Sequence, residues 1–168
     1  MGLVLKTCSF LVGVTVFIAT VVSTARAELG RCQQLMGRCD YYLCLEEEIG
    51  CGPRGYFKDF AYPYCNKYKN SELLFSSKGK KFLQFVRPCL QDQMNSYLSN
   101  LVLEGNQNKV EFCSELKSFA IDSHVTCYEQ GHFCGLGIFE KLKVEGLAAE
   151  QIFDPEIQVF AAKINQCF

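Results

Sequence analysis

The stretch Cys113–Cys134, which reads CSELKSFAIDSHVTCYEQGHFC, decides the fold. Cys113, Cys127 and Cys134 fall within one predicted helix and the loop that leaves it, and further cysteines lie on both sides of the stretch. A soluble domain so rich in cysteine is usually held by covalent cross-links in addition to its apolar core. The stretch therefore predicts a helical domain that disulfides staple together.

An export leader is predicted over residues 1–27. Lys6 supplies a positive charge, the apolar run extends from Ser9 to Val22, and Ala25-Arg26-Ala27 has the small-x-small pattern that signal peptidase reads. A membrane anchor is the alternative, although the run is short for a spanning helix and its flanks differ from those of one. We expect residues 28–168 to form one exported domain without a membrane span.

Eleven cysteines occur in the chain, and Cys8 belongs to the predicted leader. The ten that remain are an even number, which in an oxidising compartment predicts five internal bridges and no free thiol. Loss of Lys6 and Arg26 with the leader leaves 15 of the 17 basic residues against 18 acidic ones, a net charge of about −3. This balance gives no electrostatic basis for binding nucleic acid.

Helical signals begin after Arg38. Asp40 is the expected N-cap of a first helix, with Glu46–Glu48 on its solvated face and Gly50 at its end. Gly52–Gly55 reads as a turn. In the aromatic segment that follows, Pro63 argues against one uninterrupted helix. We expect the aromatic residues of this segment to belong mostly to the core; if several are exposed, they are the best candidate contact surface.

The main helix is predicted to begin at Ser76 or Ser77, to bend at Pro88 and to break at Gly105–Asn108. One stripe with steps of three and four residues predicts its buried face. The stripe consists of Phe82, Phe85, Val86, Cys89, Leu90, Met94, Tyr97, Leu98 and Leu101. The pattern resumes over Val110–Ile121, a loop is expected over Tyr128–Gly137, and Asp154-Pro155 opens a last helix. The predicted fold class is all-α.

Three motifs resemble the stanniocalcin family. They are C-x4-C-L-E at Cys39–Glu46, F-x3-G-K-x-F-x6-C at Phe75–Cys89, and C-S-x12-C-Y-x5-C at Cys113–Cys134. The order and approximate spacing of all ten cysteines are also similar to that family's intramolecular set. The resemblance extends from about Cys32 to Cys167.

The resemblance implies a pairing that the sequence alone leaves open. The implied pairs are Cys32–Cys44, Cys39–Cys65, Cys51–Cys113, Cys89–Cys127 and Cys134–Cys167. The further cysteine that links two subunits in the family lies beyond Phe168, so a covalent homodimer is not expected. The resemblance also implies a hormone-like role in calcium and phosphate regulation.

One short motif resembles a catalytic element. Ser123–Tyr128 places His124 before Cys127-Tyr128, as in the helix of secreted phospholipase A2. That chemistry needs a carboxylate directly after the histidine and a glycine-rich calcium loop a short distance upstream. Val125 occupies the first position, and the nearest such loop, Gly50–Gly55, lies far upstream. We expect no catalytic residue and an ordinary surface or half-buried His124.

Metal sites are also not expected. His124, Cys127, His132 and Cys134 could form a zinc quartet, but bridged sulfurs cannot bind zinc or act as nucleophiles. Three consecutive glutamates on one helix point in different directions, so Glu46–Glu48 are expected to be solvated rather than to bind calcium. No cofactor is predicted.

A basic patch is the remaining candidate site. Lys78, Lys80, Lys81 and Arg87, with Lys67 and Lys69 nearby, are a candidate surface for sulfated glycans or anionic head groups, and the alternative is a solvated helix start. The sequence favours a secreted, non-enzymatic factor that binds a receptor or another extracellular protein. A phospholipase A2-like hydrolase and a venom or extracellular-matrix component on the same scaffold are the alternatives.

Overall fold

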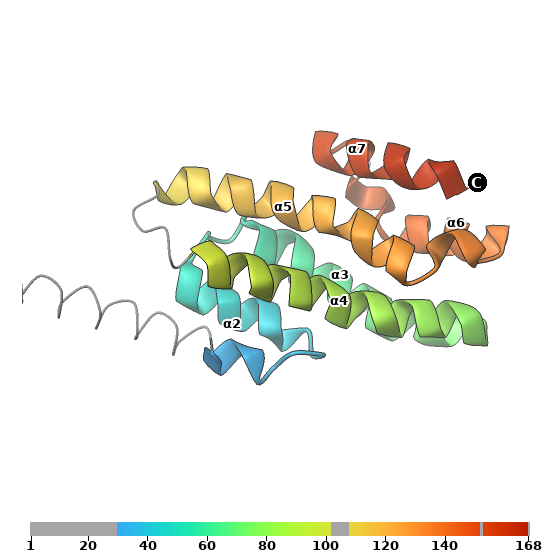
Figure 1. The fold of residues 1–168 in the computed structure, drawn as a ribbon, viewed down its shortest axis with the longest axis horizontal. Coiled ribbons are helices and arrows are strands. Elements are labelled where there is room, and N and C mark those ends of the chain that lie inside the picture. Colours follow the sequence, from blue (N-terminus) through green and yellow to red (C-terminus); the bar gives the residue numbers. More distant parts are fainter. Residues whose placement is uncertain (1–29, 102–107, 152, 168) are drawn as a thin grey trace, which may run out of the picture.

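The computed structural model describes residues 30–101, 108–151 and 153–167. The predicted leader, with Cys8, lies outside the described residues. Within the described part no strand is found and α-helices dominate, which confirms the all-α prediction (Figure 1). The helices are α2 (Asp40–Ile49), α3 (Tyr62–Ser71), α4 (Ser77–Leu101), α5 (Lys109–Gln130), α6 (Ile138–Leu147) and α7 (Pro155–Ile164).

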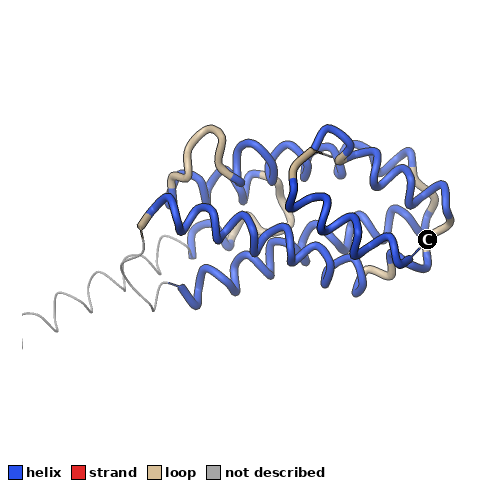
Figure 2. Tube along the Cα trace, turned by 90° about the horizontal axis from the view of Figure 1, so that it is seen from above, coloured by secondary structure: helices blue, strands red, loops and turns tan. Residues whose placement is uncertain are grey.

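Helices α4 and α5 form the long axis of the molecule. They lie side by side and run in opposite directions, and α7 packs along α5 (Figures 1 and 2). Helix α2 and the π-helix η1 (Tyr56–Ala61) lie toward the end of the bundle where α4 finishes, and α6 lies at the other end, where α4 begins. Helix α3 contacts both α4 and α6. The bundle therefore has two distinct ends joined by the α4–α5 pair.

Two clusters of buried side chains follow this division. The first is built around Tyr41, Phe57, Met94 and Leu116 where α2, η1, α4 and α5 meet. The second gathers at the α6 end, and its buried members are Tyr68, Phe75, Phe82, Leu83, Val86, Tyr128, Phe133, Leu136, Val144 and Ile164. Phe160 of α7 packs against both clusters. Burial of large apolar side chains is the main force that stabilises such a bundle.

Helix ends agree with most of the predicted signals. Ser76 Oγ accepts a hydrogen bond from Gly79 N (3.3 Å), and Asp154 accepts one from Glu156 N (2.9 Å), so both predicted caps are confirmed. Gly50 ends α2 in the left-handed conformation (φ 70°), which glycine adopts without steric cost. The cap assigned to Asp40 is wrong: Cys39 precedes the helix, and the Asp40 carboxylate, already in the first turn, pairs with Arg38 instead.

The apolar stripe of α4 is largely confirmed. Phe82, Val86, Cys89, Met94 and Leu98 are buried, and α4 continues through Pro88. The side chain of Leu101 lies outside the described residues.

Three positions of α4 depart from the prediction. Phe85 is wrong as a core residue, because it is 41% exposed, whereas Leu83 and Gln91 are fully buried. The Gln91 side chain replaces water for two backbone groups, accepting from Gly37 N (2.6 Å) and donating to Arg38 O (2.8 Å). These bonds hold the segment before α2 against α4.

Two stretches are more helical than predicted. The chain is helical from Tyr56 to Ser71, with the π-helix η1 passing into α3 and Pro63 tolerated in the first turn of α3. Helix α5 continues to Gln130, so the loop predicted from Tyr128 starts too early. The expectation that the aromatic segment is mostly core is confirmed, since Tyr56, Phe57, Tyr64 and Tyr68 are buried.

Five disulfides connect these helices. Cys39–Cys65 joins α2 to α3, Cys51–Cys113 ties the loop after α2 to α5, and Cys89–Cys127 links α4 to α5. The other two bonds are Cys32–Cys44 and Cys134–Cys167. All ten cysteines outside the predicted leader are therefore paired, and the pairs are those that the resemblance to the stanniocalcin family implies.

Candidate interaction surface

The first turns of α4 carry the basic residues that the sequence singled out. No ion pair is formed by Lys78, Lys80 or Lys81 within the described part of the chain. The Nζ of Lys78 donates a hydrogen bond to the backbone oxygen of Gly135. Lys78 and Lys81 are exposed, while Lys80 is half-buried. These three lysines thus form a group of uncompensated positive charges at the α6 end of the bundle.

Arg87 does not belong to this group, which corrects the predicted patch. Its guanidinium forms an ion pair with Glu72, and Nε donates to Leu83 O (3.3 Å). Both charged side chains are largely buried, with 14% and 20% of their surface exposed. Because its charge is neutralised and mostly covered, Arg87 belongs to the packing of α4 against the 3₁₀ turn η2 (Glu72–Leu74) and not to a solvent-facing patch. Lys67 is likewise paired, with Glu150 (2.7 Å).

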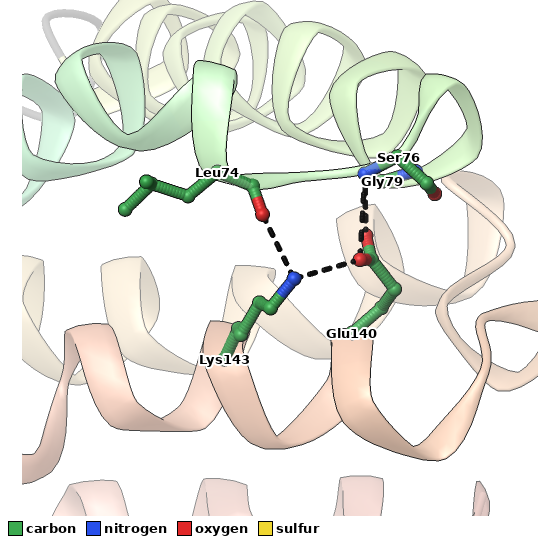
Figure 3. Close-up of polar contacts among 5 residues, drawn as sticks. All are labelled: Leu74, Ser76, Gly79, Glu140 and Lys143. Carbon is green, nitrogen blue, oxygen red and sulfur yellow. Dashed lines mark hydrogen bonds and ion pairs between the residues drawn. The ribbon is translucent and has the colours of Figure 1, made fainter.

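Glu140 and Lys143 of α6 join that helix to the start of α4 (Figure 3). The N–H of Ser76 donates to both carboxylate oxygens of Glu140 (3.3 and 3.4 Å). Lys143 Nζ donates to Leu74 O (2.8 Å) and to Glu140 Oε1 (3.1 Å). A carboxylate at a helix N-terminus is favourable because it faces the unpaired N–H groups and the positive end of the helix dipole. Glu140 therefore offsets the unfavourable lysines in the first turn of α4.

Gly79 allows this approach. A methyl group built on Gly79 would overlap Glu140 Oε2 and would lie 2.7 Å from Cδ1 of the Phe75 ring. Gly79 and Phe75 belong to the second motif that resembles the stanniocalcin family, and Phe82 of the same motif is buried beside them. The motif thus corresponds to the close contact between α4, η2 and α6.

Alanine at Gly79 is expected to lower the free energy of unfolding by about 1–3 kcal/mol, because the added methyl group overpacks this contact and displaces Glu140. Urea unfolding followed by far-UV circular dichroism measures the change. Gly146→Ala in α6 is the matched control, because a methyl group there meets nothing within 4 Å. Its stability should be unchanged or rise by up to about 1 kcal/mol. Equal effects of the two substitutions would contradict a packing role for Gly79.

Large apolar side chains are exposed beside the α4 lysines. They are Leu73 and Leu74 of η2 (85% and 69% exposed) and Ile138, Phe139 and Leu142 of α6 (50%, 77% and 51%). These five residues, together with Lys78, Lys80, Lys81 and Lys143, are called here the apolar–lysine surface. Sequence reasoning missed α6 and this surface, because the apolar residues of α6 occur on both faces of the helix.

His124 is half-buried and is surrounded by aromatic side chains. Two neighbouring cavities of about 30 Å³ each are lined in common by Phe60, Tyr64, Tyr68 and His124. The volume of each suits about one water molecule. The Tyr64 hydroxyl is buried without a hydrogen-bond partner, whereas the hydroxyls of Tyr68 and Tyr128 bond to each other.

The imidazole of His124 is held neutral. Its Nδ1 lies 2.8 Å from Ala120 O, so the proton of the neutral ring resides on Nδ1, and the rings of Phe60 and Phe160 pack edge-on against it. Burial lowers the pKa of His124 from 6.5 to about 4. The half-buried position agrees with the prediction. The contacts described for His124 are a helix carbonyl and aromatic rings.

The cysteines of the other candidate ligand sets are all bridged. Cys127 and Cys134 are bridged to different partners, so the zinc quartet is not assembled. Cys32, Cys44 and Glu48 bring sulfur and oxygen atoms close together, but one disulfide joins the two sulfurs.

The solvated face assigned to Glu46–Glu48 is wrong at Glu46. This residue is buried, and its Oε1 accepts from Gly52 N (2.7 Å) because the chain folds back over α2 after Gly50. Glu47 is exposed as predicted, while Glu48 pairs with Arg31 and is mostly covered. Glu47 also lies 3.5 Å from the Arg31 guanidinium, so Glu47 and Glu48 share one arginine while Glu46 points into the protein.

Comparison of the chain with protein-family models, with curated proteins and with solved structures finds no match. Among the described residues, no helix combines the length and the hydropathy that crossing a membrane requires.

Proposed function

We propose that this protein is a secreted, non-enzymatic factor of the stanniocalcin type that binds a receptor or another extracellular protein. The observation that carries the proposal is the order of its disulfides. All five bonds join the pairs that the motif resemblance implies, and they connect segments up to 62 residues apart. A chance agreement of five pairs is improbable because ten cysteines can pair in many ways.

The disulfides also support an extracellular site of action. Paired structural cysteines persist in oxidising compartments and are rare in reducing ones. Five bonds distributed between Cys32 and Cys167 give a rigid scaffold, and rigid surfaces bind partners with a small loss of conformational entropy. A role in calcium and phosphate regulation is the physiological assignment that the resemblance suggests for such a factor.

The proposal is tested by expressing residues 1–168 in secretory cells and analysing the culture medium. We expect protein that begins near Glu28, a non-reducing peptide map with the five pairs above, and saturable binding of the labelled protein to responsive cells. Mild trypsin treatment of those cells should abolish the binding, because the partner is a protein. Free thiols in exported material, or binding that resists trypsin, would contradict the proposal. Calcium-dependent release of fatty acid that His124→Ala abolishes would favour the hydrolase instead.

A further inference from the structure

We propose that the apolar–lysine surface attaches the protein to membranes that contain anionic phospholipids. This inference goes beyond the proposed function, because it concerns a lipid surface and not the protein partner. It rests on three observations: the apolar side chains belong to two elements that are bonded to each other, they project into solvent, and the charges beside them that have no ion-pair partner are lysines.

Contiguity follows from the bonds between α6 and η2. Lys143 Nζ is bonded to Leu74 O, and Ser76, two residues further, is bonded to Glu140 (Figure 3). Phe139 and Leu142 share the solvent side of α6, three residues apart, while Lys141 and Val144 on its other side are buried. The exposed leucines of η2 therefore border the exposed face of α6.

These apolar side chains are too exposed to line a groove or a pocket. Leu73, Leu74 and Phe139 each keep more than two thirds of their surface open to solvent, so they protrude from short elements. Protruding apolar side chains can enter the boundary between lipid head groups and acyl chains without any change of fold. Packing on a folded protein partner, in contrast, usually places such anchors in complementary pockets.

The charge of this surface selects an anionic occupant. Two carboxylates lie beside it, but each is paired: Glu140 with Lys143, and Glu72, next to Leu73, with Arg87. The three lysines at the start of α4, Lys78, Lys80 and Lys81, keep their positive charge without an ion pair among the described residues. The whole chain carries a formal net charge of −1, so the positive charge is local and not a property of the entire molecule. Lysines near an anionic membrane are attracted over roughly a Debye length, which is about 8–10 Å in physiological salt.

The residue types also favour lipid over protein. Protein–protein interfaces are enriched in aromatic residues and arginine and depleted in lysine. The apolar–lysine surface shares phenylalanine with such interfaces, but its other apolar residues are leucine and isoleucine and its basic residues are all lysines. Leucine and phenylalanine beside lysine are typical of helices that lie at a membrane interface. We therefore commit to an anionic phospholipid membrane as the occupant.

The chain contains no tryptophan, so a single substitution provides a specific probe. Phe139→Trp places the reporter in the proposed contact, and Val110→Trp places it in the first turn of α5, at the opposite end of the bundle and with similar exposure (77% and 79% for the native residues) (Figure 1). Each exported protein is mixed with vesicles of phosphatidylcholine alone or of phosphatidylcholine with phosphatidylserine. We expect both variants to sediment with the mixed vesicles, and only Phe139→Trp to show a blue shift of its emission.

Two further variants separate the apolar contribution from the charge. Leu74→Ser with Phe139→Ser, and Lys78→Glu with Lys81→Glu, should each weaken binding to the mixed vesicles by about tenfold or more. Val110→Ser should bind like the native protein. Unchanged circular dichroism and an unchanged disulfide map show that the variants are folded.

Three results would overturn the inference: no sedimentation with mixed vesicles at low salt, full binding by the Leu74 and Phe139 variant, or a blue shift at position 110. Binding to cells that trypsin abolishes, together with no binding to vesicles, would overturn this inference and leave the proposed function intact. If the protein binds vesicles but its disulfide map differs from the five pairs, the proposed function is contradicted and this inference stands.

Discussion

Alanine at both Cys51 and Cys113 is expected to lower the free energy of unfolding by about 4 kcal/mol, the largest effect among the five bridges. This disulfide closes a loop of 62 residues that includes η1, α3 and all of α4. In the chain-entropy account, a bridge restricts the unfolded chain more strongly as its loop becomes longer. Urea unfolding of the exported protein, followed by circular dichroism, measures the loss.

The matched control is alanine at both Cys32 and Cys44, whose loop spans 12 residues and whose loss is expected to be about 3 kcal/mol. If local packing determined the loss of stability, the Cys32 and Cys44 variant would lose more, because Cys32 is fully buried and Cys51 is only half-buried. A larger loss for the Cys51 and Cys113 variant can therefore be attributed to loop closure. A larger loss for the control would show that local packing, not chain entropy, determines the value of these bridges.

Local signals explain why much of the fold was predictable. The caps at Ser76 and Asp154 depend on side-chain bonds to backbone groups two or three residues away, so the sequence contains all the necessary information. The same holds for Gly50, where the left-handed residue follows directly after the helix. The stripe of α4 was found because helical periodicity places Phe82, Val86 and Met94 on one face.

Contacts formed when the chain folds back on itself explain what was missed. Glu46 looked solvated because its burial depends on the loop after α2, which returns to it at Gly52. Arg87 looked free because its partner Glu72 is brought to it by the turn before α4. The buried Gln91 could not be distinguished from a surface glutamine, since its partners lie more than 50 residues away. Cysteine spacing alone also could not select the disulfide pairs, which came from the motif resemblance.

The apolar–lysine surface was only half visible in the sequence. Three of its four lysines stand together at Lys78–Lys81, so they were recognised as a patch, whereas Lys143 was not. Its apolar part comes from η2 and α6, which are separated by more than 60 residues and are brought together where Lys143 of α6 bonds to Leu74 O. The surface therefore needed the three-dimensional arrangement before its composition could be compared with that of a membrane-binding face.

Acidification is expected to destabilise the protein through His124, by about 2–3 kcal/mol between pH 6.5 and pH 4. Burial lowers the pKa of His124 to about 4 in the folded state, whereas its value in the unfolded chain is near 6.5. Above pH 6.5 the imidazole is neutral in both states and contributes nothing. As the pH falls below 6.5, the unfolded chain binds the proton first, so stability is lost until the folded state is also protonated near pH 4.

The measurement is the difference in unfolding free energy between the native protein and His124→Phe from pH 7 to pH 4. Phenylalanine keeps an aromatic ring among Phe60, Phe160 and Tyr128 but cannot bind a proton. The difference also removes the contribution of Glu145, whose pKa is raised by burial and which both proteins share. His132→Asn is the control, because His132 is exposed and asparagine tolerates its left-handed backbone (φ 60°). The native pH dependence should persist in His132→Asn and become shallower in His124→Phe; the same slope in all three proteins would show that His124 is not buried as a neutral imidazole.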